Sequence, residues 1–598
     1  EGFFGNIYVT FLQLTDPGNM AQDIESSFLY KLFAVLAGMS GVILLSALIA
    51  FITTALDQKI EELKRGHSKV VEEGHTLILG WDDQRIIEIL RELIIANESE
   101  EDACVVILAE KDKQQMDALL RLQLPDTQTT RVVTRNGSTS SLVNLDVVSV
   151  ETCKSVIILS ECEDTAPIEE KIASDAKTIQ MVLALTAIER DEPEDDEEEF
   201  CVVAEIYNKT YREILNRSFS NVIVTIDTSD ILAKILVQTS RSVGLSVVYS
   251  EILSFDGCEM YFYHADWGDI AWKEFLYHFP DGVPMGVRHA DGSLSMRPSL
   301  DYKLKVDDDV LILADDDSTI EFLPKPVATP REHALAGGRL EQKVERELMI
   351  GWTHKSTTII EQYADYLIEG STIDIMLKEA TDSERREIEA IRGEITDVSI
   401  NLIEKNALNT EDLLSVQPFT YDNIIILADN GDETADQQVD SENIVILLLL
   451  REIFKNHPEQ SSNTKLITEV LDSQNSALVS RAGVKDVIIS NRLISMLLAQ
   501  VSENKDIKRV YDDIFEEDGS EIYLKPASLY FKEFPVEVTF AEVMLIAQKR
   551  EEVCIGVKIL ESESDPDKNF GVTLIPPKDT KYTLLAEDSL VVLAEDEL

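Results

Sequence analysis

Residues 74–97 read GHTLILGWDDQRIIEILRELIIAN, and residues 346–370 repeat the same order as RELMIGWTHKSTTIIEQYADYLIEG. In both stretches an apolar run ends in Gly-Trp and is followed by a turn and an amphipathic segment with helical spacing of its apolar residues. Apolar strands that alternate with amphipathic helices are typical of a parallel sheet covered on both faces. The sequence therefore predicts two doubly wound α/β units.

The correspondence between the two halves continues downstream. VETCKSVIILSECED (150–164) parallels FTYDNIIILADNGDE (419–433), and each half ends in a β-rich segment, near Asp309 and near Asp588. A period of roughly 270 residues indicates a domain repeat, because solenoid repeats are far shorter. A stretch with Pro, Ala and Gly separates the halves, so we expect a first unit at 74–323, a linker at 324–344 and a second unit at 345–598.

The segment before these units contains a run without charge. Residues 32–56, LFAVLAGMSGVILLSALIAFITTAL, exceed the roughly 18 uncharged residues that indicate a membrane-spanning helix. Lys59, Lys64 and Arg65 follow this run, whereas acidic residues precede it, so the positive-inside rule places the long carboxy-terminal part in the cytoplasm. We assign residues 28–56 to an inner transmembrane helix and residues 57–73 to a linker.

Residues 1–27 form a short apolar segment and a polar loop. Apolar residues between Phe3 and Leu12 recur with helical spacing, but this helix is too short to span a bilayer. A short helix, a polar loop and a full span occur in this order in re-entrant pore loops. An interfacial helix followed by an ordinary turn fits equally well, because Asp-Pro-Gly-Asn at 16–19 is also a good turn sequence. The chain begins at Glu1 without a methionine, and we expect it to be a fragment of a longer protein.

Gly38 and Gly41 lie within the predicted span. Small residues in membrane helices permit close packing of a second helix, and the same residues can accommodate a gating bend. Both interpretations remain open from the sequence.

The composition argues against nucleic acid as a partner and against a disulfide framework. The formal charge of the 598 residues is −57, which argues against nucleic-acid binding because phosphate contacts need clustered Lys and Arg. Solubility or adaptation to a salty cytoplasm is the preferred explanation of this charge, and attraction of cations is the alternative. The six cysteines show neither CxxC pairs nor metal-ligand spacing, so we expect no disulfide framework, no zinc site and a reducing compartment.

The turn after the first strand of each unit differs from a dinucleotide-binding turn. Gly80 matches the first glycine of GxGxxG, but Asp82 and Arg85 occupy the other two positions, and Gly351 is followed by Thr353 and Ser356. Side chains at these positions disfavour the close approach of a pyrophosphate. Glu110, at the end of the second predicted strand, stands where a ribose-binding acid would stand. No catalytic motif is present, so we expect a binding protein and no enzyme.

Several of these segments together resemble the CASTOR/POLLUX family of ion channels. The Asp-Pro-Gly-Asn turn is similar to that family's D-A/S-G-N filter, although Pro17 replaces Ala or Ser. The other similar segments are GHTLILGW at 74–81, VVILAEKDK at 105–113 and FPDGVPMGV at 279–287.

This resemblance implies a homotetrameric cation channel embedded in a lipid bilayer. Each chain would contribute a re-entrant pore helix, an inner helix and two tandem Rossmann-like domains of the RCK type, each with a β-rich subdomain, that assemble into a cytoplasmic gating ring. Thr15, Asp16, Pro17, Gly18 and Asn19 would line or adjoin the ion pathway, and Gly38 or Gly41 would act as a gating hinge.

Potassium or calcium would be the permeant cation, and calcium would also be a candidate regulatory ligand. No metal ligands are assigned, no covalent cofactor is expected, and the turn residues Gly80, Asp82, Glu110 and Gly351 are candidates for ligand binding. The alternative is a membrane-anchored regulatory subunit that senses nucleotides or ions for a separate cation transporter.

Overall fold

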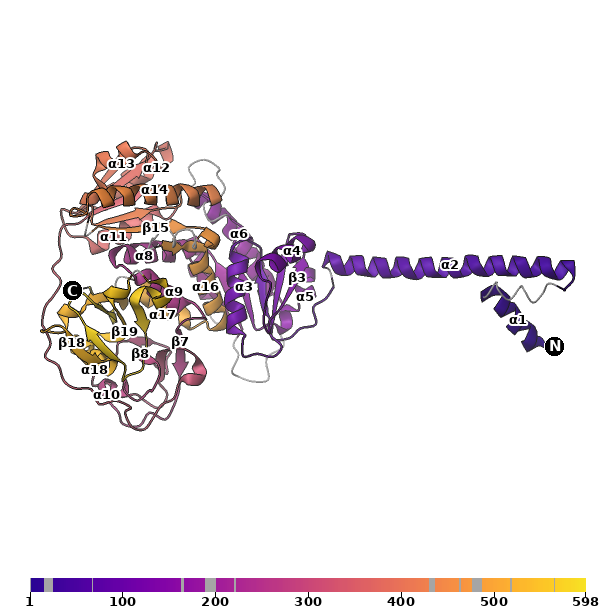
Figure 1. Cartoon of the computed structure of the whole chain (residues 1–598), viewed down its shortest axis with the longest axis horizontal. Helices are drawn as coiled ribbons and strands as arrows, with labels where there is room; N and C mark the ends of the chain where they lie inside the picture. The colour runs from indigo at the N-terminus through magenta and orange to yellow at the C-terminus, as the bar shows by residue number, and fades with distance from the viewer. Residues whose placement is uncertain are drawn as a thin grey trace.

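The computed structural model describes most of the chain. The described residues are 2–15, 25–66, 68–162, 166–188, 200–219, 222–429, 436–461, 464–475, 487–516, 519–563 and 565–597. A single long helix projects from a body of sheets and helices, and a short helix lies beside its far end (Figure 1).

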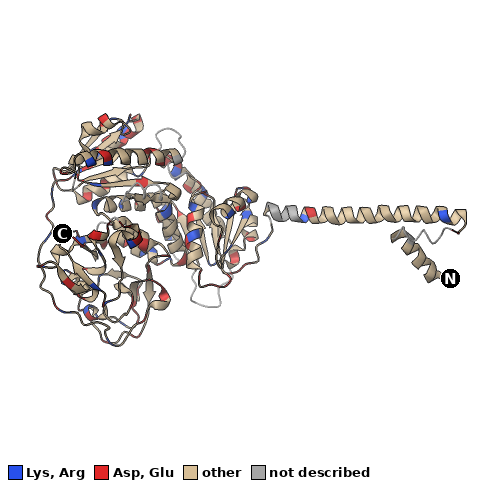
Figure 2. Cartoon of the chain, in the orientation of Figure 1, with Lys and Arg blue, Asp and Glu red and all other residues tan. Residues whose placement is uncertain are grey.

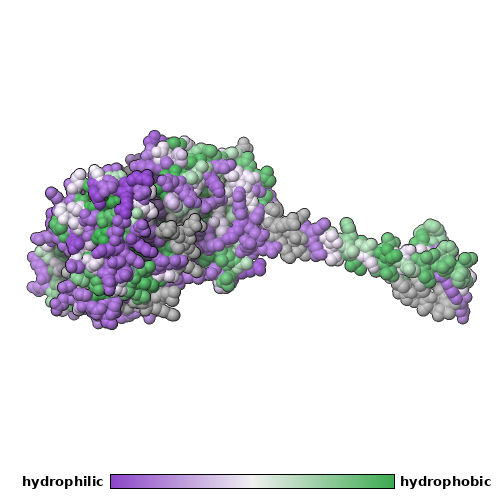
Figure 3. Space-filling model, turned by 90° about the horizontal axis from the view of Figure 1, so that it is seen from above, coloured by the Kyte–Doolittle hydropathy of each residue, from purple (hydrophilic) through white to green (hydrophobic). Residues whose placement is uncertain are grey.

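The two amino-terminal helices are α1, Phe3–Thr15, and α2, Phe28–Arg65. Within the described residues, α2 is the one helix long and apolar enough to cross a membrane, over Phe28–Lys59. Charged side chains are confined to the two ends of this span, and hydrophobic side chains cover the rest (Figures 2 and 3). The helix extends nine residues beyond Leu56, at which the sequence places the start of the linker, because 57–65 contains no Pro or Gly that would end it.

The first unit contains a six-stranded parallel sheet in the order β3-β2-β1-β4-β5-β6. Its strands are β1 Thr76–Leu79, β2 Cys104–Ala109, β3 Arg131–Asn136, β4 Ser155–Ile158, β5 Cys201–Glu205 and β6 Ile223–Ile226. The helices between them are α3 Arg85–Ala96, α4 Lys113–Gln123, α5 Leu142–Val147, α6 Ile168–Thr186 and α7 Lys209–Ser218.

The second unit repeats this sheet in the equivalent order β13-β12-β11-β14-β15-β16. Its strands are β11 Arg346–Ile350, β12 Thr372–Leu377, β13 Ser399–Glu404, β14 Asn423–Ile426, β15 Lys465–Val470 and β16 Val487–Ile489. The helices between them are α11 Ser356–Tyr366, α12 Asp382–Glu394, α13 Thr410–Val416 and α14 Asp436–Asn456. The predicted duplication of a doubly wound α/β unit is confirmed.

Each unit also carries a small antiparallel sheet, as the β-rich segments predict. The first sheet has the order β7-β10-β8-β9, and the second has the matching order β17-β22-β19-β20. The strands of the first are β7 Glu259–Tyr263, β8 Val283–Arg288, β9 Leu294–Met296 and β10 Asp309–Ala314. Those of the second are β17 Glu521–Pro526, β19 Val553–Lys558, β20 Val572–Leu574 and β22 Ser589–Ala594, with a separate pair β18 Val536–Thr539 and β21 Lys581–Leu584.

The segment between the units is held against the second small sheet. Arg331 pairs with Glu542 at 2.6 Å, and Arg550 donates to the carbonyl of Gly338 at 2.9 Å. Glu542 lies in α18, Phe540–Gln548, and the Arg331 and His333 side chains lower its pKa to about 2 against the opposing effect of burial. The linker is therefore docked along a defined path.

The two units exchange helices. The helix that follows β6, α8 Thr228–Arg241, packs against α11, β14 and β15 of the second unit. In return α16, Ser490–Glu503, which follows β16, packs against α3, β4 and β5 of the first unit. Apolar side chains from one face of both sheets and from both exchanged helices consequently share one hydrophobic core. The helices α9 Leu245–Leu253 and α17 Ile507–Phe515 continue this core toward the small sheets.

A core substitution on α16 tests this exchange. Leu498 is completely buried, and Leu498→Ala should cost about 2–5 kcal/mol because it leaves a cavity. We expect faster amide hydrogen exchange in β4 and β5 of the first unit, although these strands are far from Leu498 in sequence. Faster exchange confined to the second unit would contradict the exchange of helices.

Candidate functional site

The predicted ion pathway begins at the end of α1. Thr15 is the last residue of α1, and its hydroxyl donates to the carbonyl of Phe11 at 2.8 Å. The remaining residues of the predicted filter lie outside the described residues: Asp16, Pro17, Gly18 and Asn19. Their placement in an ion pathway stays a prediction.

Gly41 belongs to the face of α2 that is covered by the end of α1, and Gly38 lies one turn before it on α2. Ala34 and Gly38 are buried, and a Cβ atom at Gly41 would collide with the backbone carbonyl of Leu14. Glycine therefore allows the end of α1 to contact the backbone of α2 closely. The helix continues without interruption through both glycines (Figure 1). Of the two interpretations left open by the sequence, close packing accounts for Gly41 in this conformation, and the hinge stays a proposal.

A compact joint connects α2 to the first unit. Gly66 follows α2 with φ of 76°, a left-handed conformation that commonly terminates helices. A Cβ atom there would lie 2.8 Å from the Lys113 side chain and 3.3 Å from the Asn136 nitrogen. Two residues later, the Ser68 carbonyl accepts a hydrogen bond from Arg135 Nε at 2.7 Å. Displacements of α4 and β3 can therefore pass to α2 through direct contacts.

The same joint continues toward α5. Val70 is buried, and its N–H donates to the carbonyl of Val147 at 2.7 Å. Lys69 pairs with Asp146 at 3.0 Å and with Glu151 at 3.1 Å. These two hydrogen-bonded carboxylates raise the pKa of the exposed Lys69 ammonium group.

The predicted ligand-binding turns occupy equivalent positions in the two units. Gly80 and Gly351 have φ of 104° and 94°. A Cβ atom would lie 3.0 Å from the Leu159 carbonyl oxygen in the first turn and 3.2 Å from that of Leu427 in the second. Glycine is needed at both positions because the backbone is left-handed and the neighbouring strand is close.

The backbone donors of these turns are already bound by side chains of the protein. Asp82 accepts from the N–H groups of Gln84 and Arg85 at 2.9 and 2.8 Å. In the second unit the Trp352 N–H donates to Asp429 at 3.0 Å, and the Thr353 N–H donates to Ser356 at 2.9 Å. A phosphate would have to displace these acceptors and approach Asp82 or Asp429. The geometry therefore disfavours a pyrophosphate at either turn.

A buried ion pair lies beside each turn. Arg85 pairs with Glu205 at 2.7 Å, and Lys355 pairs with Glu469. All four side chains are at most 5% exposed. Each glutamate belongs to the fifth strand of its unit along the chain, and each also accepts a backbone N–H from the loop after the fourth strand. The equivalent placement shows that the duplication extends to polar core residues.

A second equivalent pair of acids fixes the loops after β5 and β15. Asp175 on α6 accepts from the N–H groups of Tyr207 and Asn208 at 3.0 and 2.8 Å. Asp440 on α14 accepts from Leu471 and Asp472 at 2.8 and 3.0 Å. These carboxylates accept hydrogen bonds from loop N–H groups that would otherwise lack an acceptor.

A crevice of about 560 Å³ opens at the carboxyl ends of β11 and β12, beside Gly351. Leu427 and Asp429, which follow β14, also line this crevice, and the strand order reverses between β11 and β14, the usual ligand position in doubly wound sheets. Its charged lining residues are Lys378, Glu379, Glu384, Lys405, Asp429 and Glu442. Carboxylates outnumber ammonium groups here, which again disfavours a phosphorylated ligand.

Glu110 lies exposed at the end of β2. Within the described part of the chain it makes no hydrogen bond or ion pair, so nothing orients it toward Gly80 and Asp82. The described residues also contain no group of three or more His, Cys, Asp or Glu side chains placed to hold a metal ion.

Comparisons with known proteins agree with this architecture. Residues 229–328 match the family model described as Castor and Pollux, part of voltage-gated ion channel, and residues 72–221 match that of the calcium-activated potassium channel slowpoke-like RCK domain. The chain is 29% identical to the probable ion channel CASTOR of Oryza sativa subsp. japonica, over 99% of this chain and 67% of that protein. It is 28% identical to the ion channel CASTOR of Lotus japonicus, over 99% of this chain and 70% of the relative.

Over nearly its whole length the chain is similar to the CASTOR/POLLUX ion channels, at 28–29% identity. Its two units are RCK-type domains, and the protein is a membrane protein, as expected. The structure of the human SLO3 gating ring is similar in fold, with 13% identity, a TM-score of 0.56 and coverage of 87% of this chain and 99% of that chain. The relatives carry the names of ion channels, in agreement with the expectation of a non-enzymatic protein.

The polar residues that form buried ion pairs beside the two turns were not predicted from the sequence. The fifth strand of each unit contains an acidic residue in its apolar run. Glu205 ends this run in the first unit, and Glu469 lies within it in the second. This repeated acid was a usable signal. The basic partners could not be matched from spacing, since Arg85 and Lys355 stand at different distances from the Gly-Trp of their turns.

Removing one partner of a buried pair tests its contribution. Lys355→Met leaves Glu469 buried without its cation and should cost about 3–5 kcal/mol. Lys355→Met combined with Glu469→Gln should recover more than half of that loss, because no buried charge remains. Native-state hydrogen exchange of the full chain measures both. Equal stability of the single and double variants would contradict the argument.

A buried acid near the amino end of the interior strand β11 gives a pH-dependent prediction. Glu347 on β11 is 1% exposed, and burial raises its pKa to about 8. Asn423 donates to one carboxyl oxygen at 2.9 Å, while the other oxygen has no partner within the described residues. The folded chain therefore holds a proton that the unfolded chain releases near pH 4.5, and stability falls as pH rises from about 4.5 to 8.

Glu347→Gln should remove this contribution. The melting temperature of the variant relative to the parent chain should rise between pH 5 and pH 8, because glutamine mimics the protonated acid. A difference in melting temperature that stays constant across this range would show that Glu347 titrates normally.

Proposed function

We propose that this chain is the subunit of a homotetrameric cation channel that passes potassium, calcium or both and is opened by a ligand of its cytoplasmic RCK-type domains. The observation that carries the proposal is the direct joint between the apolar helix α2 and the first RCK-type unit. Large side chains of α2 such as Leu44 and Phe51 are 65% and 73% exposed, so lipid and other copies of α2 must cover them.

In this proposal the four copies surround one axis, with residues 15–19 of each copy along the ion pathway. Asp16 supplies a ring of negative charge, and backbone oxygens freed by Gly18 replace water around the ion. The large negative charge of the chain favours cations near both mouths.

Gating requires a ligand that binds the open and closed arrangements of the ring with different affinity. A displacement of α4 and β3 would act on Gly66 and Ser68 and then on α2. Gly38 and Gly41 would act as the hinge only if α1 moves away, because α1 covers this face here. Calcium is a candidate regulatory ligand, and the crevice beside Gly351 is a candidate ligand site.

The second candidate function is a membrane-anchored regulatory subunit of a separate cation transporter. It rests on the fact that the described residues contain one helix able to span a membrane. Particle symmetry in detergent distinguishes the two, since a channel requires a four-fold particle and an anchor is compatible with a monomer or dimer.

Substitution of the predicted filter acid tests the channel. Asp16→Ala should change the conductance or the reversal potential in mixed potassium, sodium and calcium, because it removes a ring of charge from the ion pathway. Planar-bilayer recordings of the purified chain provide the measurement, with Asp126→Ala, in the loop before β3, as a control. Unchanged currents would exclude Asp16 from the ion pathway, and the absence of any flux would favour the regulatory subunit.

A further inference from the structure

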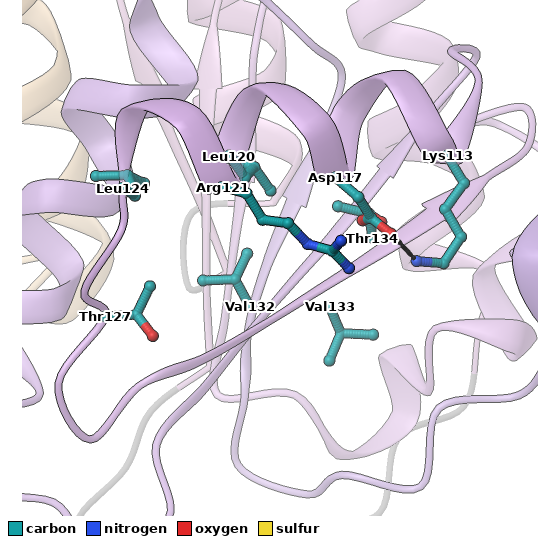
Figure 4. Close-up of a pocket in the computed structure, with 9 residues that line it drawn as sticks. All are labelled: Lys113, Asp117, Leu120, Arg121, Leu124, Thr127, Val132, Val133 and Thr134. Carbon is teal, nitrogen blue, oxygen red and sulfur yellow. Dashed lines mark hydrogen bonds and ion pairs between the residues drawn. The ribbon is translucent and has the colours of Figure 1, made fainter.

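A groove separates helix α4 from the edge strand β3 of the first unit (Figure 4). Its volume is about 390 Å³, and its floor is formed by Leu120, Leu124 and Val132. Lys113, Asp117 and Arg121 project from α4 along its length (Figure 4). We call it the α4–β3 groove.

The backbone of β3 is open on the side of this groove. Its pairing partner is β2 alone, and the N–H groups of Arg131 and Gly137 bond to the β2 side. Alternate residues of a parallel strand point the other way, so Val132 and Thr134 direct their N–H groups outward. Neither group has a partner in the part of the chain that the structure describes. An open edge of this kind can pair with another extended segment.

Two cations and one acid line the groove: Lys113 pairs with Asp117 at 2.6 Å, which leaves the charge of Arg121 unbalanced within this lining although the chain as a whole carries a charge of −57. Lys113 and Arg121 stand on α4, and Arg131 and Arg135 project from β3 toward the opposite face of the sheet, as their register with β2 requires. Arg121 is exposed, points into the groove and makes no hydrogen bond or ion pair with any described residue (Figure 4). On the opposite face Arg131 pairs with Glu72, and Arg135 donates to the Ser68 carbonyl, so Arg121 is the cation that would face a strand added to β3, and it favours an acidic segment.

The second unit supplies an internal comparison. The equivalent groove between α12 and β13 has a volume of about 920 Å³. There Arg392 donates to the outward carbonyl of Ile400 at 3.0 Å, and Arg385 pairs with Glu404. These arginines are used within the unit itself, whereas Arg121 is available for a ligand.

The distance from the membrane favours a peptide over a lipid headgroup. Helix α2 continues from Leu56 to Arg65 before Gly66 contacts Lys113 at the end of the groove. At 1.5 Å per residue this separates the groove from the apolar span by about 13 Å. The headgroup layer on each side is only about 5–7 Å thick.

We propose that the α4–β3 groove binds an extended acidic segment of a protein partner, which adds a strand to the edge of β3 and places a carboxylate against Arg121. Backbone hydrogen bonds to Val132 and Thr134 provide affinity, and the charges provide selectivity. Because Lys113 also contacts Gly66, an occupied groove acts on the joint to α2.

The test measures binding of a fluorescein-labelled peptide, (Glu-Val)4, to the full chain in detergent. We expect binding that weakens with salt and falls about tenfold or more in Arg121→Glu. Arg392→Glu, at the equivalent groove, is the matched control and should stay within about twofold. A peptide with a central proline should bind weakly because it lacks an N–H for the added strand.

Three results would overturn the proposal. They are the absence of binding, equal affinity of the parent and Arg121→Glu chains, and equal affinity for (Lys-Val)4. Arg121-dependent binding of vesicles that contain anionic phospholipid, without binding of the peptide, would replace the peptide by a lipid surface. None of these measurements involves ion flux, so their failure is separate from failure of the channel proposal.

Discussion

The reciprocal packing of α8 and α16 is the constraint on which the rest of the soluble structure depends. A doubly wound sheet must be covered on both faces, because its strands are apolar on both. In each unit one face is covered by the unit's own helices, and part of the other face is covered by a helix of the other unit. Neither sheet is complete without the other half of the chain.

This arrangement connects features that are far apart in the sequence. Helix α16 contacts α3, whose first residue is Arg85, and Arg85 anchors the turn of the first unit through Glu205. The carbonyl of Arg85 also accepts a hydrogen bond from Ser495 on α16. Changes in the second unit can therefore reach the first sheet, and β3 and α4 of that sheet contact the end of α2. In the proposed channel these contacts provide a continuous path from the second unit to α2 along which ligand binding would act.

Much of this fold could be predicted from the sequence. The apolar runs ending in Gly-Trp marked the first strand of each unit, and the uncharged run from Leu32 to Leu56 marked the long helix. Periodicity shows that α8 and α16 have an apolar face, but it carries no information on which sheet receives that face. For this reason the exchange of helices could not be predicted from the sequence.

The candidate sites were predicted less completely. The mismatch at Asp82 and Arg85 predicted a turn unlike a dinucleotide site, and the structure adds a physical reason for that prediction, because Asp82 accepts from the backbone donors of the turn. The acid that serves the same purpose in the second unit, Asp429, comes from a different strand end and could not be identified by spacing. Close packing at Gly41 depends on Leu14, a contact between separate helices that local patterns do not encode.

Splitting the chain between the two units tests the central claim most directly. Residues 1–344 and 345–598, produced separately, should each lack cooperative thermal unfolding, because each sheet then exposes the face that the other half covers. Co-production should restore a one-to-one complex with a cooperative transition. Two halves that each unfold cooperatively at the temperature of the intact chain would contradict the account.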